Sequence, residues 1–152
     1  MSEELHTKPL VIDNGTGFTK NGFAGEDQPR SVFPTMMGYP KNPIVMPDVE
    51  GWIREYYIGE EAMNMRGVLK LIYPMEHGQV RDWQAMERIW HYTFYNDMRV
   101  NPNEHPIMLT EPPLNDNRNK EKMAELMFET FNVPAMYVSM QAILSLLSLI
   151  HI

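Results

Sequence analysis

The chain has no cysteine among its 152 residues, which excludes a disulfide framework, a thiol nucleophile and a thiolate metal site. This absence suits a reducing compartment. No apolar run approaches the ~18 residues that a membrane-spanning helix needs, since the apolar stretch 142–152 falls well short. The N-terminus begins Met1-Ser2-Glu3-Glu4 and lacks the apolar segment of a secretory signal. We therefore expect neither a membrane span nor a signal peptide.

Positive charge is scarce. The chain has 13 Lys and Arg against 20 Asp and Glu, a net charge of −7. A nucleic-acid partner is not expected on electrostatic grounds, and the acidic balance suits basic protein partners. The length fits one domain with a real core, and the hydrophobic share of 43% is ordinary for a soluble globular protein.

A glycine-rich turn near the N-terminus is the most informative local pattern. The apolar run Leu10–Ile12 predicts a buried strand, and Phe18–Phe23 predicts a second one. Asn14-Gly15 between them predicts a hairpin turn, because both residue types tolerate positive φ.

The residues around this turn have the chemistry of an anion site. Gly15 and Gly17 leave the turn without side-chain bulk, so backbone N–H groups can point at a phosphate. Thr16 adds a hydroxyl donor, Lys20 a cation, and Asp13 a carboxylate suited to hydrated Mg²⁺. From spacing alone, an ordinary hairpin with a solvated turn is the alternative.

Downstream, the pattern alternates between strands and helices, which predicts an α/β domain. A short strand is expected near Ser31–Phe33, and prolines and glycines break any long element in residues 35–73. Asp82 is the expected N-cap of a helix. Its apolar stripe consists of Trp83, Met86, Trp90 and Phe94.

The C-terminal third continues this alternation. We expect a strand at Ile107–Thr110, then a helix capped by Asp116 or Asn117 that ends before Pro134. Its apolar face is Met123, Leu126, Met127 and Phe131. A short strand at Ala135–Val138 and a last apolar helix at Ser139–Leu149 complete the pattern.

Fourteen methionines are unusual for this length. Those at helix or strand positions, such as Met86, Met123 and Met127, are interpreted as flexible core filler. Met36, Met37 and Met46 lie in a loop-rich region and are the better candidates for an adaptable binding surface.

The segment from Asp13 to Lys20 closely resembles the first phosphate-binding hairpin of the actin family. Further ordered matches extend the resemblance over roughly Val11 to Leu146. They are Gly22–Gly25, Val32–Pro34, Arg66-Gly67, Tyr73–Gly78, Trp90-His91, Glu104–Pro106, Leu109–Asn115, Phe128–Asn132, Pro134–Tyr137 and Gln141–Leu146. Actin and actin-related proteins are matched about equally well.

The resemblance implies the actin-like ATPase fold, an α/β fold with a ribonuclease-H-like core and an inserted small subdomain. Residues 1–34 and 74–152 would form the first large subdomain, incomplete here. Residues 35–73 would form the small outer subdomain, with a mobile loop from Gly38 to Gly59.

The resemblance also implies roles for the site residues. Asn14, Gly15, Thr16, Gly17, Phe18 and Lys20 would bind ATP, and Asp13 would hold Mg²⁺ through water. Gln141 would position the water that attacks the γ-phosphate, in keeping with phosphoryl transfer.

The family continues past this point with a second phosphate loop and the other half of the molecule, whereas Leu147–Ile152 departs from its pattern. We therefore expect only the N-terminal half of an actin-like molecule. Weak or no binding of ATP and Mg²⁺ by the chain alone is expected, with hydrolysis only in a complete two-half molecule.

The resemblance implies a cytoplasmic, cytoskeletal protein that acts as a filament or complex subunit with other actin-family subunits or actin-binding proteins. The alternatives are a non-catalytic interaction module and a truncated product of a longer gene. Because residues 142–152 are strongly apolar, we expect a partner or another copy to cover them.

Overall fold

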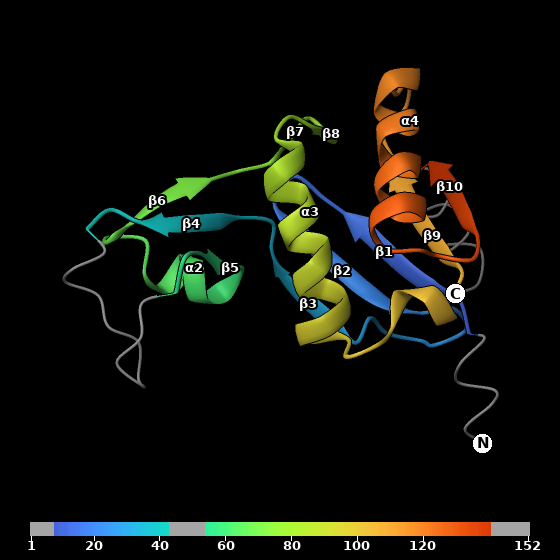
Figure 1. Ribbon diagram of the computed structural model, residues 1–152, viewed down its shortest axis with the longest axis horizontal. Coiled ribbons are helices and arrows are strands. Elements are labelled where there is room, and N and C mark those ends of the chain that lie inside the picture. Colours follow the sequence, from blue (N-terminus) through green and yellow to red (C-terminus); the bar gives the residue numbers. More distant parts are fainter. Residues whose placement is uncertain (1–7, 43–53, 141–152) are drawn as a thin grey trace.

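The computed structural model describes residues 8–42 and 54–140. A mixed five-stranded sheet with the order β10-β9-β1-β2-β3 forms its centre (Figure 1). Its strands are β1 (Leu10–Asn14), β2 (Phe18–Phe23), β3 (Ser31–Pro34), β9 (Ile107–Glu111) and β10 (Met136–Met140). The first three strands form an antiparallel meander, and β9 and β10 run parallel to β1. The carboxyl ends of β1, β9 and β10 therefore meet at one edge of the sheet.

Two helices cover one face of this sheet, which we call the inner face (Figure 1). Helix α3 (Trp83–His91) continues into the π-helical turn η2 (Tyr92–Asp97), and a short 3-10 turn, η3 (Pro102–Glu104), follows. Helix α4 (Asn117–Glu125) continues into the π-helical turn η4 (Leu126–Thr130). The predicted cap Asp82 accepts from the Ala85 N–H at 3.0 Å. Of the two candidates for α4, Asp116 is the N-cap, accepting from the Arg118 N–H.

The core lies between the inner face and these helices. Strand residues such as Leu10 and Leu109 pack there with Met86, Trp90 and Phe94, all at most 1% exposed. The apolar stripe predicted for the first helix is thus confirmed for these three residues, and Trp83 at its start is partly buried. The face predicted for α4 is also buried, and Met86, Met123 and Met127 belong to the core as expected.

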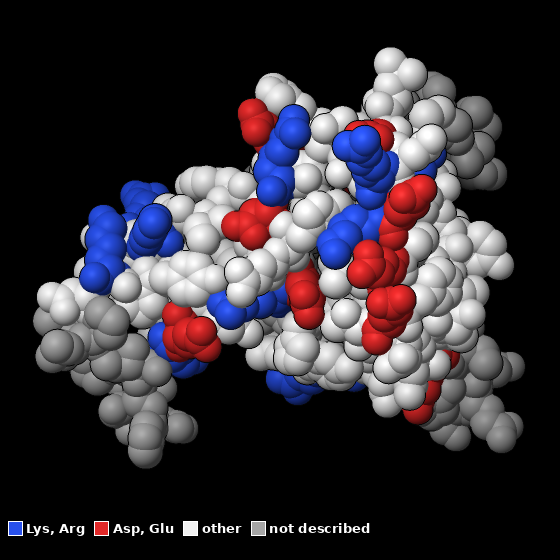
Figure 2. Space-filling model, turned by 45° about the horizontal axis from the view of Figure 1, so that its top comes forward, with Lys and Arg blue, Asp and Glu red and all other residues white. Residues whose placement is uncertain are grey.

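A second, smaller sheet projects to one side of the first (Figure 1). It has the order β5-β4-β6, formed by β4 (Met37–Pro40), β5 (Tyr57–Ile58) and β6 (Leu69–Ile72), with the short helix α2 (Glu60–Asn64) beside it. It has a small core of its own, made of Met36, Tyr57, Ala62 and Leu69. Figure 2 shows Lys and Arg side chains gathered at the outer end of this sheet, on a chain that is acidic overall.

Two of the methionines predicted to form an adaptable surface are buried instead. Met36 is 3% exposed and Met37 is 0% exposed, so neither can form an adaptable binding surface. Met36, which directly precedes β4, belongs to the core of the small sheet, and Met37, the first residue of β4, belongs to the main core, because successive side chains of an extended chain point to opposite sides. Met46 lies outside the described residues.

The predicted last helix also begins too early. Ser139 and Met140 belong to β10, where they pair with Thr110 and Glu111 of β9. Pairing with a buried parallel neighbour outweighs the helical pattern at these two positions. The remainder of the predicted helix lies outside the described residues. In the part of the chain that is described, no helix is long and apolar enough to cross a membrane.

Candidate functional site

The carboxyl edge of the sheet carries a row of polar residues on its outer face, opposite the helices. Register places Asp13 beside Lys20 of β2, and the next strand on the other side contributes Thr110. The Thr110 hydroxyl donates to Asp13 Oδ1 at 2.7 Å. Ser139 extends the row as the register partner of Thr110. The row thus brings an anchored carboxylate and a lysine side by side at this edge of the sheet.

The turn beside this row differs from the predicted one. Asn14 is the last residue of β1 and pairs with Thr19, so the loop consists of residues 15–17. Positive φ was expected at Asn14 and Gly15, but neither adopts it. That expectation is wrong because a three-residue loop closes the hairpin here, which leaves Asn14 extended.

Close packing explains Gly15. A Cβ added there would lie 2.6 Å from the Phe18 carbonyl oxygen, so any side chain would push the hairpin open. The Gly15 N–H donates to that carbonyl at 3.0 Å and so does not point outward at an anion. Gly17 is different, since a Cβ there would meet no atom within 4 Å. Packing within the chain therefore requires a glycine at position 15 but not at position 17. Gly17 instead leaves open space in front of the loop.

Thr16 joins the loop to Tyr73–Gly78, another segment whose sequence resembles the family. Its side-chain oxygen accepts a hydrogen bond from the Gly78 N–H at 3.0 Å. Gly78 ends the turn of the hairpin formed by β7 (Met75–Glu76) and β8 (Gln79–Val80), with a φ of 78°. A hydroxyl that accepts this bond can still donate its own hydrogen outward. The loop is therefore held in place without losing the predicted hydroxyl donor.

The remaining predicted ligands fall in three places. Phe18 is 54% exposed and Lys20 is exposed, both on the outer face. The Asn14 side chain is 3% exposed and lies on the inner face, where Oδ1 accepts from Trp90 Nε1 at 3.4 Å. Asn14 can therefore offer only its backbone to a ligand on the outer face. Gln141 lies outside the described residues.

Two contacts of this site were not predicted. The helical pattern predicts only a core role for Trp90, and no pattern predicts a role for Thr110, although both lie in segments that resemble the family. The structure shows that Thr110 orients Asp13 and that Trp90 orients Asn14. Within the described ranges, no group of three or more His, Asp or Glu is placed to hold a metal ion. Asp13 therefore remains the metal-side residue by resemblance alone.

Comparison with known families supports the resemblance. A family model described as actin matches residues 4–151, which is nearly the whole sequence. The matched range includes the polar row, the glycine loop and the Gly78 turn that the structure brings together. By this match, the chain belongs to the actin family.

Proposed function

We propose that this chain supplies one wall of an ATP- and Mg²⁺-binding cleft in a cytoskeletal, cytoplasmic protein of the actin family. The polar row carries the proposal, because Asp13 is held by Thr110 at 2.7 Å and has Lys20 as its cross-strand neighbour. Other actin-family subunits or actin-binding proteins would be its partners. The sheet would be the ribonuclease-H-like core, as its order β10-β9-β1-β2-β3 supports.

The subdomain boundaries belong to the same proposal. Residues 1–34 and 74–152 would form the first large subdomain and residues 35–73 the inserted small one. The separate core of Met36, Tyr57, Ala62 and Leu69 supports an insertion that folds around its own apolar residues.

The residues at the loop fit a phosphate group with its magnesium ion. Gly17 leaves room for close approach, Thr16 offers a hydroxyl donor, and Lys20 supplies a positive charge on the same face. A carboxylate such as Asp13 suits a hydrated Mg²⁺, which keeps most of its water ligands. The bound nucleotide would supply the phosphoryl group, and these residues would bind and orient it.

A nuclear magnetic resonance titration with Mg-ATP tests the site. We expect weak binding, with a dissociation constant above ~1 μM, because a nucleotide held from one side leaves much of its charge in water. Shifts should be confined to residues 13–20 and Thr110. Binding should weaken at least about tenfold in Lys20→Met but not in the control Lys122→Met, which changes a partly exposed lysine of α4. Millimolar Mg-ATP without any shift at the loop would contradict the proposal and favour the interaction module.

Gln141 is proposed to orient the attacking water in a complete two-half molecule. It follows Met140, the last residue of β10, whose register partner Glu111 ends β9 at the edge that holds Asp13. Gln141→Ala should slow single-turnover hydrolysis by roughly 10²-fold while nucleotide affinity changes little. The reason is that orienting the attacking water lowers the energy of the transition state and adds little to nucleotide binding. Equal hydrolysis rates for the two proteins would remove Gln141 from the mechanism.

A further inference from the structure

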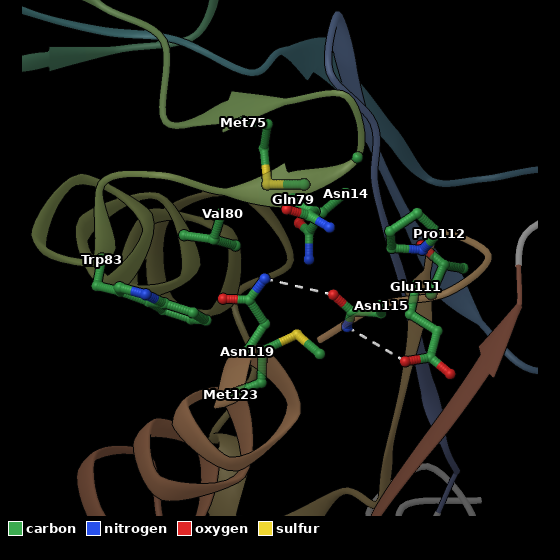
Figure 3. A pocket seen from close by; sticks show the side chains of 12 residues that line it. Asn14, Met75, Gln79, Val80, Trp83, Glu111, Pro112, Asn115, Asn119 and Met123 are labelled. Atoms are coloured by element: carbon green, nitrogen blue, oxygen red, sulfur yellow. Dashed lines mark hydrogen bonds between the residues drawn. The ribbon is translucent and has the colours of Figure 1, made fainter. Parts of the chain in front are cut away.

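A small pocket lies behind the glycine loop, on the inner side of the sheet (Figure 3). The β7–β8 hairpin, the start of α3 and the start of α4 surround it. Four amide side chains line it: Asn14, Gln79, Asn115 and Asn119. The centre of a water molecule can occupy only about 10 Å³ of this space. The pocket is therefore far too small for a phosphate or a nucleotide, and it suits about one water molecule.

Asn14 presents an unpaired donor to this pocket. The Trp90 indole nitrogen can only donate a hydrogen bond, so the Asn14 oxygen must face it and the amide nitrogen must face the other way. That nitrogen has less than 1 Å² exposed and no partner among the described residues. Figure 3 shows it pointing toward the gap between Asn115 and Asn119. A buried donor of this kind is rarely left unpaired in native proteins.

An acceptor is available on the far side of the gap. Asn119 Nδ2 donates to Asn115 Oδ1 at 3.4 Å, and Asn115 Nδ2 donates to Glu111 Oε2 at 3.2 Å. These two bonds fix the orientation of the Asn115 amide. Its carbonyl oxygen has a second lone pair, which can accept one more hydrogen bond.

We propose that this pocket holds one internal water molecule that accepts from Asn14 Nδ2 and donates to Asn115 Oδ1. Internal waters commonly make about three hydrogen bonds, and the amide of Gln79, which also lines the pocket, is available for the third. The water ties the end of β1 to the loop that precedes α4. The tie continues through Glu111 to Lys120 of α4, whose Nζ lies 3.2 Å from Glu111 Oε1. Because the pocket lies behind the loop, the inference does not depend on nucleotide binding.

A crystal structure that resolves ordered water tests the proposal without any substitution. The expected result is one water within hydrogen-bonding distance of both Asn14 Nδ2 and Asn115 Oδ1. A direct hydrogen bond from Asn14 Nδ2 to a protein acceptor would overturn the proposal, as would a dry pocket.

A double-mutant cycle gives an independent readout in solution. Asn14→Ala and Asn115→Ala are combined, and the equilibrium constant for urea unfolding is measured for all four proteins. Residues that share a water should couple. The effect of the double variant on the unfolding constant should therefore differ from the product of the two single effects by roughly fivefold. The control pair is Asn14→Ala with Asn103→Ala, an exposed amide in η3 near the opposite end of β9. If the effect of the double variant equals the product of the effects of Asn14→Ala and Asn115→Ala to within about twofold, the proposal is overturned.

Discussion

Asn21 is an unusual residue in the middle of β2. It is 1% exposed, and neither atom of its amide has a partner among the described residues. Unlike Asn14, Asn21 does not line the water-sized pocket. Removing a buried polar group that is unpaired costs little, because no hydrogen bond is lost. We expect Asn21→Ala to change the free energy of unfolding by less than about 0.5 kcal/mol, or to raise it.

The register partner of Asn21 provides a matched control for this prediction. Ile12 is also 1% exposed, and Ile12→Ala should cost roughly 2–5 kcal/mol through lost apolar contacts and a cavity. Chemical denaturation of both variants is the measurement. A loss above about 2 kcal/mol for Asn21→Ala would show that its amide has a partner after all.

Asp97 connects a single residue to the pH dependence of stability. Burial raises the pKa of the Asp97 carboxyl above its ordinary value, and one of its oxygens accepts from the Ser31 hydroxyl. The folded state therefore binds this proton more tightly than the unfolded state does. The contribution of Asp97 to stability increases as the pH falls through the raised pKa, and it stays at its lower value at neutral pH. Asp97 also lies at the C-terminal end of η2, where a negative charge is unfavourable.

Asp97→Asn should therefore stabilise the protein at pH 7 by roughly 0.5 kcal/mol. The difference from the unmodified protein should shrink as the pH falls through the raised pKa of Asp97, because its carboxyl then becomes neutral like the amide. Denaturation curves at several pH values measure this. A constant difference at every pH would mean that the charge of Asp97 plays no part.

At the scale of elements, Arg88 joins α3 to the small sheet. Its guanidinium donates to the Tyr39 hydroxyl at 2.7 Å and lies 4.6 Å from the centre of the Tyr56 ring. One hydrogen bond and one cation–π contact are each worth about 1 kcal/mol. Arg88→Ala should therefore cost roughly 1–2 kcal/mol and should speed hydrogen exchange in β4 more than in β1. Arg118→Ala, at the exposed start of α4, is the control. Equal exchange in β4 before and after Arg88→Ala would show that this contact does not hold the small sheet.

Elements with a strong local signal could be predicted from the sequence. β2 matches its predicted range, and both helices begin after a predicted cap because Asp82 and Asp116 accept N–H bonds within the next turn. The end of β10 was mispredicted because pairing with β9, a tertiary effect, decides it. The Met36 and Met37 side chains were misplaced because burial depends on packing between sheets rather than on local composition.

The same distinction between local signals and long-range contacts applies to the candidate site. The chemistry of Asp13, Thr16 and Lys20 is local and could be proposed from spacing. Their supports could not, because Thr110 lies 97 residues from Asp13 and Trp90 lies 76 residues from Asn14. No periodic pattern encodes contacts over such separations.

At the scale of the whole molecule, the outer face of the main sheet carries exposed apolar side chains. Val32 is 48% exposed and Tyr137 is 62% exposed, and Tyr137 shares a row with Met108 and Val11. Exposed apolar surface of this kind favours association. We expect the 152-residue chain to self-associate and the double variant Val32→Lys/Tyr137→Lys to do so less.

The control for this experiment is Leu114→Lys, which changes a 98% exposed leucine in the loop before α4 and should leave association unchanged. Phe18 is also exposed on this face, but it is left unsubstituted because it belongs to the proposed site. Light scattering across a range of protein concentrations is the measurement. A monodisperse unmodified chain would contradict the prediction.

The strand order has a consequence for how the chain folds as it is synthesised. The meander β1-β2-β3 closes locally, but β9, which covers the other edge of β1, lies about a hundred residues further along the chain. An emerging polypeptide therefore carries β1 with one unpaired edge until β9 arrives, and an unpaired edge is a template for intermolecular pairing. Long-range parallel pairing is intrinsically slow to form, so the edge of β1 stays unpaired for longer still. The β1–β2 hairpin is thus made early but completed late, and a nascent chain would need protection at β1 until β9 has been synthesised.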